Sequence, residues 1–448
     1  GSGTHVVRRI YGDYAYGAGP RKGCWWDETC ETAGRSRFTG AEKVDVAVIG
    51  AGFTGLSAAI KLAESGATVT VLDAEHVGWG ASGRNGGFCC LGGSKADDAE
   101  MDRRFGKTAR LEFRKAEKNA VSYVDRIISE NAIDVDRHSD GETELAHRPK
   151  DMSGMRASAR AIEENYDVTP KIIEPYELEA EGLGGGPFYG GMTLPIGFGL
   201  NPRKYVNGLA RAAEKAGARI FENSPVTGIK RVGDCWQLQC GAHRLDAGQV
   251  VLATNGYSSE DVPSWVAGRF MPIQSTGLVT RPMTQAELEA QGWTTDQMAY
   301  DTRSLLHYFR LMPDRRFLFG MRGALLTGAT AEARARQRTR ADFERMFPAW
   351  AQVESLNGWS GLLSVARRKV PFVGPVPKHP GLWVSMCYHG NGVAMGSYSG
   401  ALLAELMLKG ENDRIPRMMR EPLRKFPFGR SRRLIMLPLY AQLMLTDY

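Results

Sequence analysis

Cysteine is scarce in this chain of 448 residues, and it does not occur in the spacings that bind metals or build disulfide frameworks. The seven cysteines are an odd number: Cys24 and Cys30 are six positions apart, Cys89 and Cys90 are adjacent, and no Cys-x2-Cys pair is present. This distribution argues against a disulfide-stabilised secreted domain and against structural zinc. We therefore expect no metal site and a location in the reducing cytoplasm.

Long apolar runs are also lacking. No run reaches the roughly 18–20 residues that a membrane-spanning helix needs, and residues 6–9 (Val-Val-Arg-Arg) are too short and too polar for the apolar part of a signal peptide. We expect neither a transmembrane segment nor a signal peptide. The hydrophobic content of 43% and the charged content of 24% are ordinary for a globular protein, and the length allows two or three domains.

An excess of one charge sign occurs only near the C-terminus. Residues 414–433 hold eight basic residues against one acid, which accounts for the formal net charge of +7 and leaves the rest of the chain balanced. We expect no nucleic-acid partner, because such proteins carry a basic face with stacking aromatics. For the basic tail and the apolar residues 434–445 after it, two interpretations stay open. The tail folds back on its own protein, which we favour, or it makes a weak contact with an anionic membrane surface.

The most informative segment runs from Val44 to Asp73 and predicts a strand, a glycine turn, an amphipathic helix and a second strand that ends in an acid. Gly50 permits a tight turn, Gly52 lets backbone N–H groups approach a pyrophosphate, and Gly55 lets the helix pack close to the sheet. The helix N-terminus adds a positive dipole end. Asp73 lies 18 residues beyond Gly55, where a carboxylate can accept bonds from both ribose hydroxyls. The segment therefore predicts a dinucleotide site.

Two further glycine-rich segments favour FAD over NAD. Residues 387–400 form a second strand–glycine–helix turn, which can direct a helix N-terminus at the negative N1–C2=O edge of a reduced flavin. Residues 78–87 follow Asp73 closely, and Ser82, Arg84 and Asn85 offer donors to phosphate or flavin edges. The alternative for residues 78–87 is a surface loop. FAD accounts for both turns, whereas NAD needs one.

The remaining sequence predicts further helices and strands around these turns. Residues 6–40, rich in aromatics and glycine, are interpreted as an extended arm laid across the body. We predict helices at about 100–130, 151–166, 202–216 and 329–347, a strand pair at about 133–147, and strands at 250–253, 305–311, 317–321 and 381–386.

Because the nucleotide-binding pieces are separated in sequence, we predict two interleaved domains of α/β class. One is a Rossmann-type FAD-binding domain and the other a mixed-sheet (α+β) substrate domain. The predicted segments are an N-terminal arm (6–40), FAD-binding parts (41–94, 196–264 and 351–413), substrate-domain parts (95–195 and 265–350) and a basic, apolar C-terminal tail (414–448).

Four motifs together, VAVIGAGFTGLSAAIKLAESGATVTVLDA, GWGASGRNGG, VVLATNGY and YHGNGVAMGSYSG, resemble the D-amino-acid oxidase/sarcosine oxidase family of FAD amine oxidoreductases over about residues 40–448. The resemblance implies a flavin at the interface of the two domains. It also implies hydride transfer to flavin N5 from a C–H next to an amine nitrogen, followed by imine hydrolysis. The expected substrate is a small amine, γ-glutamylputrescine-like or another secondary or primary amine or amino acid, and the acceptor is oxygen or another molecule.

The motifs also supply the predicted cofactor contacts. These are Gly50, Gly52, Phe53, Thr54, Gly55, Asp73, Ala74, Gly80, Ala81, Ser82, Arg84, Asn85, Gly86, Gly87, Val226, Ala253, Gly390, Asn391, Gly392 and Val393. Some relatives tether the flavin through a cysteine or a histidine, but residues 361–371 contain no cysteine and residues 80–87 no histidine, so we expect non-covalent FAD. Ala394 stands near the place of a lysine in some sarcosine oxidases, which leaves a dehydrogenase open.

The candidate catalytic residues are Tyr308, Arg310, Arg322 and His389. Tyr308 and Arg310 alternate along a predicted strand and should face the flavin together, and one of the arginines could clamp a substrate carboxylate. For each, a purely structural role is the alternative, and Trp359 is interpreted as core. A flavin monooxygenase or NAD(P)H-dependent reductase would need a second nicotinamide-binding glycine motif, which we do not find. A non-enzymatic flavoprotein is the remaining alternative.

Overall fold

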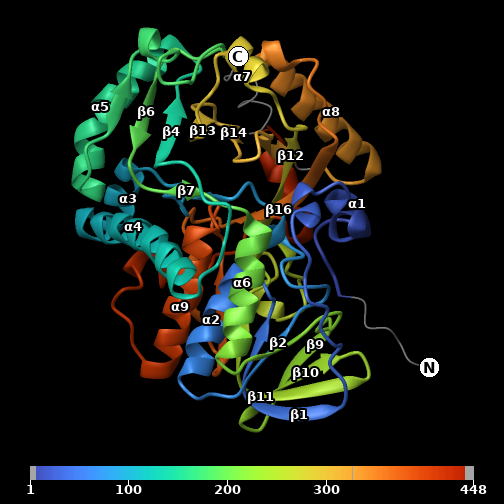
Figure 1. The fold of residues 1–448 in the computed structure, drawn as a ribbon. Helices are drawn as coiled ribbons and strands as arrows, with labels where there is room; N and C mark the ends of the chain where they lie inside the picture. The colour runs from blue at the N-terminus through green and yellow to red at the C-terminus, as the bar shows by residue number, and fades with distance from the viewer. Residues whose placement is uncertain (1–6, 325, 439–448) are drawn as a thin grey trace.

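Two eight-stranded sheets, built from alternating segments of the chain, form the framework of the protein (Figure 1). The computed structural model describes residues 7–324 and 326–438. The predicted fold class is confirmed: a largely parallel α/β sheet lies beside a mixed sheet.

The first sheet has the order β17-β18-β11-β1-β2-β8, and β9 and β10 extend β11 as an antiparallel ribbon. The pairs from β18 to β8 are parallel, with Val46–Ile49 of β1 between Gln249–Leu252 of β11 and Val69–Leu72 of β2. The strands are β1 (Ala41–Ile49), β2 (Val69–Leu72), β8 (Arg219–Phe221), β9 (Gly228–Val232), β10 (Cys235–Cys240), β11 (His243–Leu252), β17 (Phe372–Pro375) and β18 (Leu382–Met386).

Three helices cover one face of this sheet: α2 (Phe53–Glu64), α6 (Pro202–Lys215) and α9 (Ala394–Lys409) (Figure 1). The alternation of β1 explains the layering, because Val46 and Val48 face these helices whereas Ala47 and Ile49 belong to a second core on the opposite face. α6 begins at Pro202 behind the N-cap Asn201, as the sequence predicts. The parallel sheet is thus buried on both faces, which is usual for such sheets.

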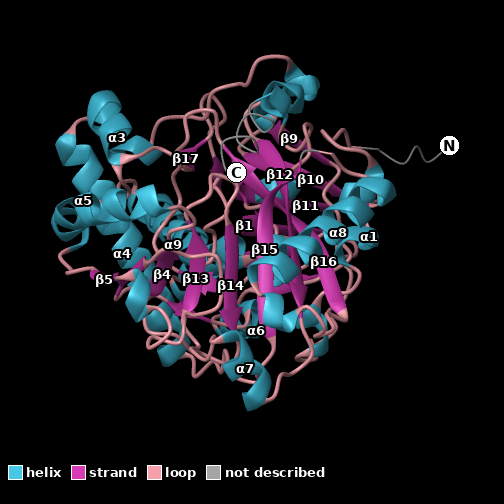
Figure 2. Ribbon diagram, turned by 90° about the horizontal axis from the view of Figure 1, so that it is seen from above, coloured by secondary structure: helices cyan, strands magenta, loops and turns pink. Residues whose placement is uncertain are grey.

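The second sheet has the order β16-β12-β15-β14-β13-β4-β6-β5 and is antiparallel except between β13 and β4. Figure 2 shows β13, β14 and β15 side by side. Its strands are β4 (Glu142–Leu145), β5 (Lys171–Ile173), β6 (Gly191–Leu194), β12 (Met271–Val279), β13 (Met298–Asp301), β14 (His307–Leu311), β15 (Phe317–Ala324) and β16 (Asn357–Val365).

One face of the second sheet packs against α7 (Gln285–Gln291) and α8 (Ala329–Met346) through an aromatic core. Phe309 and Phe319 stack there at 6.0 Å between ring centroids, and Phe347 and Trp350 stack at 5.3 Å just after α8. Since side chains alternate along a strand, the neighbours of Phe309, namely Tyr308 and Arg310, point to the opposite face.

Two predicted elements differ from the structure. The helix expected over about 100–130 is broken at Gly106, whose φ of +91° separates α3 (Asp98–Phe105) from α4 (Lys107–Glu130). The strand pair expected at 133–147 is wrong: only β4 and an isolated bridge at His138 form, because Asp136 and Ser139 have positive φ and turn the chain. The remaining elements are α1 (Ala18–Arg21), β3 (Phe88–Cys89), α5 (Pro149–Tyr166) and β7 (Phe198–Gly199).

The N-terminal arm lies across the body as predicted, but it is not extended. It coils into α1 and two short 3-10 helices, Asp13–Tyr16 and Trp25–Glu28. Tyr11 and Tyr16 are buried against Met271, Ile273 and Leu362. Burial of its aromatic side chains therefore fixes the arm to the second sheet.

The described part of the C-terminal tail folds back on the protein, as we favoured. Arg432 is fully buried, its Nε donates to the carbonyl of Phe270 at 2.6 Å, and its guanidinium pairs with Glu260. Residues 439–448, which include the end of the apolar stretch, lie outside the described residues, and a weak membrane contact through the tail stays a hypothesis. Within residues 7–324 and 326–438, no helix combines the length and apolar character that crossing a membrane requires.

The division into interleaved domains stays our interpretation. The strands of the first sheet lie in residues 41–72, 219–252 and 372–386, and those of the second in 142–194, 271–324 and 357–365. β16 thus pairs with β12 in the second sheet, although it falls within the segment we assigned to the third FAD-binding part.

Candidate active site

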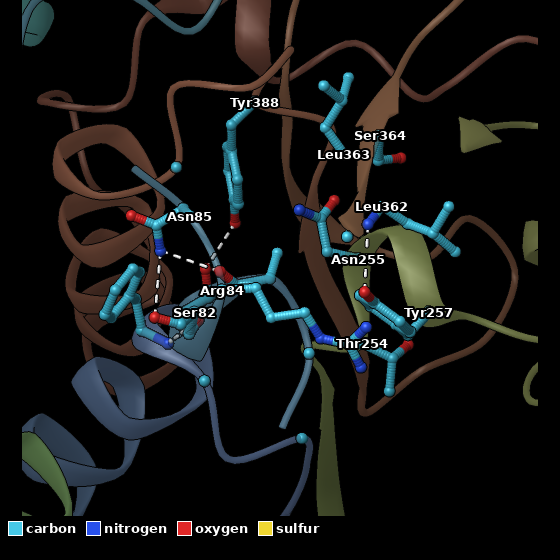
Figure 3. Close-up of a pocket in the computed structure, with 18 of the residues that line it drawn as sticks. Ser82, Arg84, Asn85, Thr254, Asn255, Tyr257, Leu362, Leu363, Ser364 and Tyr388 are labelled. Atoms are coloured by element: carbon cyan, nitrogen blue, oxygen red, sulfur yellow. Dashed lines mark hydrogen bonds between the residues drawn. The ribbon is translucent and has the colours of Figure 1, made fainter. Parts of the chain in front are cut away.

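A long cavity runs between the carboxyl ends of the first sheet and the inner face of the second. The glycine turn after β1, the loop of residues 78–91 and the turn after β18 line it, together with the segment after β11, strands β12, β14, β15 and β16, and three arm residues. Figure 3 shows a part of it, in which Arg84 extends between Tyr388 on one side and Tyr257 and Leu362 on the other. Ligands of open α/β sheets bind at this edge of the sheet.

The glycine turn after β1 has the geometry that a phosphate needs. Gly50 adopts a φ of +109°, and a Cβ there would lie 2.5 Å from the carbonyl oxygen of Ala253. Gly55 lies beneath the turn, where a Cβ would be 2.0 Å from the carbonyl oxygen of Gly50. α2 begins at Phe53 behind the N-cap Gly52, which offers no side-chain cap. The helix N-terminus therefore presents its partial positive charge to the cavity.

Asp73 lies at the end of β2, beside this turn. Its Oδ2 accepts a hydrogen bond from the N–H of Ala51 and its Oδ1 one from the N–H of Glu75, both at 2.9 Å. Burial raises the pKa of Asp73 to about 6, although the two backbone N–H groups act in the opposite direction. The carboxylate lines the cavity and keeps lone pairs that can accept bonds from hydroxyl groups.

In the loop of residues 78–87, most polar side chains form hydrogen bonds to protein groups that fix the conformation of the loop. Ser82 Oγ accepts from the N–H of Phe53 at 3.0 Å, and Asn85 Nδ2 donates to the carbonyl of Ala81 at 2.8 Å. Arg84 donates to the carbonyls of Trp79 and Ser360, but its buried Nη2 has no acceptor among the described residues (Figure 3). A buried guanidinium nitrogen without a partner indicates that an anionic or carbonyl group of a ligand belongs there.

The second glycine turn brings another helix N-terminus to the cavity. Gly390, Asn391, Gly392 and Val393 line it, and α9 follows with no side-chain cap. Tyr388 Oη lies 2.8 Å from Thr54 Oγ1, so the two glycine turns are in direct contact. Two helix N-termini therefore face one cavity, as FAD requires in our prediction.

His389 lies within this turn but its ring does not line the cavity. Nδ1 donates to the carbonyl of Gly93 at 2.9 Å, and Nε2 accepts from the N–H of Ala366 at 3.1 Å. Burial lowers the pKa of His389 to about 4. With both nitrogens used and the ring neutral, His389 fixes the turn to the neighbouring segments.

The inner face of the second sheet supplies a different set of side chains. Tyr308 lines the cavity and its Oη lies 2.8 Å from Ser275 Oγ. Arg322 also lines it, and its guanidinium contacts the carbonyls of His389 and Gly390 at 3.3 and 3.2 Å. Glu142 of β4 faces the same region, where burial raises its pKa to about 7 while the thiol of Cys90 and the charge of Arg322 moderate the shift. A carboxylate and a guanidinium thus share this part of the cavity.

Arg310 points toward the same face but does not reach the cavity. Its Nε donates to the carbonyl of Gly86 at 3.0 Å and its Nη2 to that of Leu200 at 2.7 Å, while Nη1 lies 2.5 Å from His138 Nε2. Burial lowers the pKa of Arg310 to about 9. The side chain holds the loop of residues 78–87 from beneath.

The structure brings most of the predicted site residues to the cavity wall. Gly55, Gly87, Arg310 and His389 lie behind the wall instead, and Trp359 is buried yet also lines the cavity. Sequence reasoning missed several lining residues. These include Val7, Arg9, Tyr16, Glu75, Trp79, Cys90, Lys95, Glu142, Ser224, Tyr257, Ser275, Tyr300, Leu362 and Tyr388. Trp79, Tyr257 and Tyr388 stand inside the glycine motifs and could have been found there, whereas Glu142 and Arg9 carry no motif.

Comparison with known proteins identifies the family. A family profile described as "FAD dependent oxidoreductase" matches residues 45–406, which is most of the chain. The chain belongs to this family. It is 32% identical over 391 residues to a probable oxidoreductase OrdL of Rhizobium meliloti, covering 87% of this chain and 89% of that protein. It is 27% identical over 390 residues, with the same coverage, to the γ-glutamylputrescine oxidoreductase of Escherichia coli.

Solved structures agree on the fold. The iminodiacetate oxidase of Chelativorans sp. BNC1 superposes with a TM-score of 0.69 at 18% identity, over 84% of this chain and 98% of that chain. The resemblance noted from the sequence motifs is thus confirmed, and the protein is an FAD-dependent oxidoreductase. The cavity fits FAD, because it combines two helix N-termini whose N-cap residues provide no side-chain cap, a carboxylate at Asp73 and the Nη2 of Arg84, which has no partner among the described residues.

Proposed function

We propose that FAD lies along the cavity, non-covalently, and that the lining residues of the three glycine segments hold it. Asp73 would bind the ribose. The glycine turn, loop residues 80–82 and Arg84 would bind the diphosphate, and residues 85–86 and 390–393 would bind the flavin ring. Support comes from the position of Asp73 beside the turn and from the second uncapped helix N-terminus at Gly390–Val393. Val226 and Ala253 line the same cavity.

We further propose that the enzyme oxidises a C–N bond of a small amine that also carries an acidic group. The observation that carries this proposal is the presence of both Glu142 and Arg322 on the wall formed by the second sheet. A guanidinium suits a carboxylate, and a buried carboxylate suits an ammonium group. The 27% identity to a γ-glutamylputrescine oxidoreductase, whose printed name gives such a substrate, supports the same class.

The residues divide the work of binding as follows. Arg322 holds the substrate carboxylate and Glu142 its non-reacting ammonium group, while Tyr308 and Tyr300 limit the width of the site. The reacting amine must be neutral, because its nitrogen supplies the electron pair that stabilises the cation left at the carbon. Positioning of the C–H against the cofactor provides most of the required rate enhancement.

Bound FAD supplies a two-electron acceptor at N5. The amine loses a hydride from carbon and becomes an iminium ion, which water hydrolyses to a carbonyl compound and a free amine or ammonia. Reoxidation of the cofactor by oxygen would make the enzyme an oxidase, and reoxidation by another acceptor would make it a dehydrogenase. The second candidate, a dehydrogenase, uses the same site and differs only in this last step. Ala394 at the α9 N-terminus favours it, because this residue stands near the place of a lysine in some sarcosine oxidases.

The experiment is anaerobic absorbance spectroscopy of the purified holoenzyme with γ-glutamylputrescine, and with putrescine and glutamate as matched controls. Bleaching of the flavin band by γ-glutamylputrescine alone is expected. Bleaching by putrescine to the same extent would contradict the role of the acidic group, and no bleaching by any amine would contradict amine oxidation. Admission of air separates oxidase from dehydrogenase. Flavin that stays with the precipitate after acid denaturation would contradict the non-covalent proposal.

We also propose a cytoplasmic location. Support comes from the cysteines, because all seven carry free thiols, five of them buried. Subcellular fractionation followed by immunodetection tests this location. Recovery of the protein outside the cytoplasmic fraction would contradict the proposal.

A further inference from the structure

The N-terminal arm contributes to the cavity although it precedes the segment that the family profile matches. The match begins at residue 45, whereas Val7, Arg9 and Tyr16 line the cavity. The arm is held in place on both sides of Arg9. Arg8 forms an ion pair with Asp261 at 2.9 Å, and Tyr11 Oη donates to the carbonyl of Pro272 at 2.6 Å. The position of Arg9 is therefore fixed independently of its own side chain.

The guanidinium of Arg9 has a fixed position, but its Nε has no hydrogen-bond partner among the described residues. Its Cζ lies 4.5 Å above the ring centroid of Tyr16, and its buried Nε has no hydrogen-bond acceptor within residues 7–324 and 326–438. Burial lowers the pKa of Arg9, and the charge of Glu75, which also lines the cavity, acts in the opposite direction. A buried, unsatisfied guanidinium nitrogen costs free energy unless a ligand pairs with it.

Arg84 is a second arginine with a buried nitrogen that has no partner among the described residues. Its guanidinium lies 5.1 Å from the ring centroid of Tyr257, and Tyr257 in turn lies 6.5 Å from the ring of Tyr16. The two arginines, each with an unsatisfied buried nitrogen, therefore flank one pair of aromatic rings on the wall of the same cavity. Two guanidinium groups that face one cavity suit a ligand with more than one negative charge.

We infer that Arg9 is a ligand of the FAD diphosphate, supplied by an arm that lies outside the segment matched by the family profile. The inference rests on the proposed placement of FAD in this cavity. The arm would then help to retain the cofactor. Removal of the Arg9 side chain should increase the rate of FAD dissociation without disturbing the second sheet. A Lys at this position would keep the charge but lose the planar donor, so its effect should be intermediate.

The test is displacement of FAD from the holoenzyme by ADP and by adenosine, followed through the fluorescence of released flavin. The ratio of the two midpoint concentrations measures the contribution of the phosphates and cancels the affinity for FAD itself. In wild type, ADP should be the stronger competitor. In Arg9→Ala, the preference for ADP should fall about 10-fold, and in Arg9→Lys it should fall less. Arg338→Ala, which removes an exposed arginine of α8 that does not line the cavity, should keep the wild-type ratio.

The outcomes distinguish the placement of FAD in the cavity from the role of Arg9 as a phosphate ligand. If wild type does not prefer ADP to adenosine, the diphosphate does not lie in this cavity and the placement of FAD fails. If wild type prefers ADP and Arg9→Ala keeps that preference, Arg9 is not a phosphate ligand and this inference alone fails. Equal weakening of ADP and adenosine would mean that Arg9 only holds the arm, which also overturns it. Thermal unfolding of each apoprotein confirms that the variants are folded.

Discussion

The carboxylate of Asp73 and the backbone N–H of Ala51 are joined by a hydrogen bond of 2.9 Å, although 22 residues separate them. The acid at the end of β2 therefore holds the glycine turn that follows β1. Glu75 donates its N–H to the other carboxylate oxygen at the same distance. One side chain thus shapes the turn proposed for the diphosphate and faces the place proposed for the ribose.

Asp73→Asn should weaken FAD binding by roughly 10–100-fold, because charge-assisted hydrogen bonds contribute about 1.5–3 kcal/mol. Since burial raises the pKa of Asp73 to about 6, wild-type affinity for FAD should also fall as the pH drops through about 6. The variant should lack this pH dependence. Fluorescence titration of apoprotein with FAD measures both effects, and the exposed Asp234→Asn serves as control. Equal affinity of wild type and Asp73→Asn would contradict the role.

The sequence predicted the first glycine turn correctly because all its determinants are local. Strand periodicity, Gly50, Gly55 and the acid at Asp73 lie within 30 residues, and each has a direct steric or hydrogen-bonding consequence in the fold. The same holds for α6, where Asn201 and Pro202 define the helix start. Such signals depend on neighbouring residues and not on tertiary packing.

The orientation of Arg310 and His389 could not be predicted in this way. Arg310 is held by His138, which is 172 residues away, and His389 by the carbonyl of Gly93, 296 residues away. Glu142 was missed for a related reason, since a lone glutamate in a short strand gives no signal until β4 pairs with β13. The arm was missed as part of the cavity because its position depends on contacts with Pro272 and Asp261.

Arg310→Lys should reduce the FAD content and lower the free energy of unfolding by about 2–4 kcal/mol, since lysine cannot replace the three contacts of a buried guanidinium. Arg322→Lys is the matched comparison on the next strand, β15. It should keep the FAD content and raise the KM of carboxylate-bearing amines by roughly 10-fold or more. Steady-state kinetics and flavin absorbance distinguish the two. If Arg310→Lys instead raised the KM and kept the full FAD content, Arg310 would be the arginine that binds the substrate carboxylate.

Glu142→Gln should raise the KM for a substrate with a second ammonium group by roughly 10–100-fold, because loss of one partner of a buried charge pair costs about 2 kcal/mol or more. The pKa of Glu142 is raised to about 7 by burial, so in wild type the KM should fall as the pH rises through about 7 and the carboxylate ionises. That dependence should disappear in Glu142→Gln. Amines without the second ammonium group provide the control, and an unchanged pH profile would contradict the assignment.

Gly400→Ala should destabilise the protein by about 2 kcal/mol or more, because overpacking against backbone cannot relax easily. A Cβ on Gly400 would lie 2.2 Å from the carbonyl oxygen of Thr54, so the close approach of α9 to α2 depends on this glycine. Gly154→Ala in α5 is the matched control: nothing lies within 4 Å of its Cβ position, and helix propensity should stabilise it by about 0.5–1 kcal/mol. Chemical denaturation measures both, and similar effects for the two would refute the packing argument.

His307 joins two buried carboxylates on the aromatic side of the second sheet, with Nδ1 2.7 Å from Asp301 Oδ2 and Nε2 2.8 Å from Asp342 Oδ2. Burial alone would lower the pKa of His307, but the two hydrogen bonds outweigh it and raise the pKa above its usual value. The folded state therefore binds the proton more tightly than the unfolded state. Its contribution to stability is complete below the unfolded pKa of about 6.5 and is lost as the pH rises through the folded pKa.

His307→Gln should accordingly lower the free energy of unfolding by about 3 kcal/mol near pH 6, since it removes the charged ring that bridges the two buried carboxylates. The difference from wild type should shrink as the pH rises through the raised pKa of His307, because wild type then loses the same contribution. Urea denaturation at several pH values measures both curves. His379→Gln, a half-buried ring stacked on Trp236 at the first sheet, should show no such convergence. Parallel curves for wild type and His307→Gln would mean that His307 stays neutral in the folded protein, and the buried carboxylates would then be balanced by Arg303 and Arg345 alone.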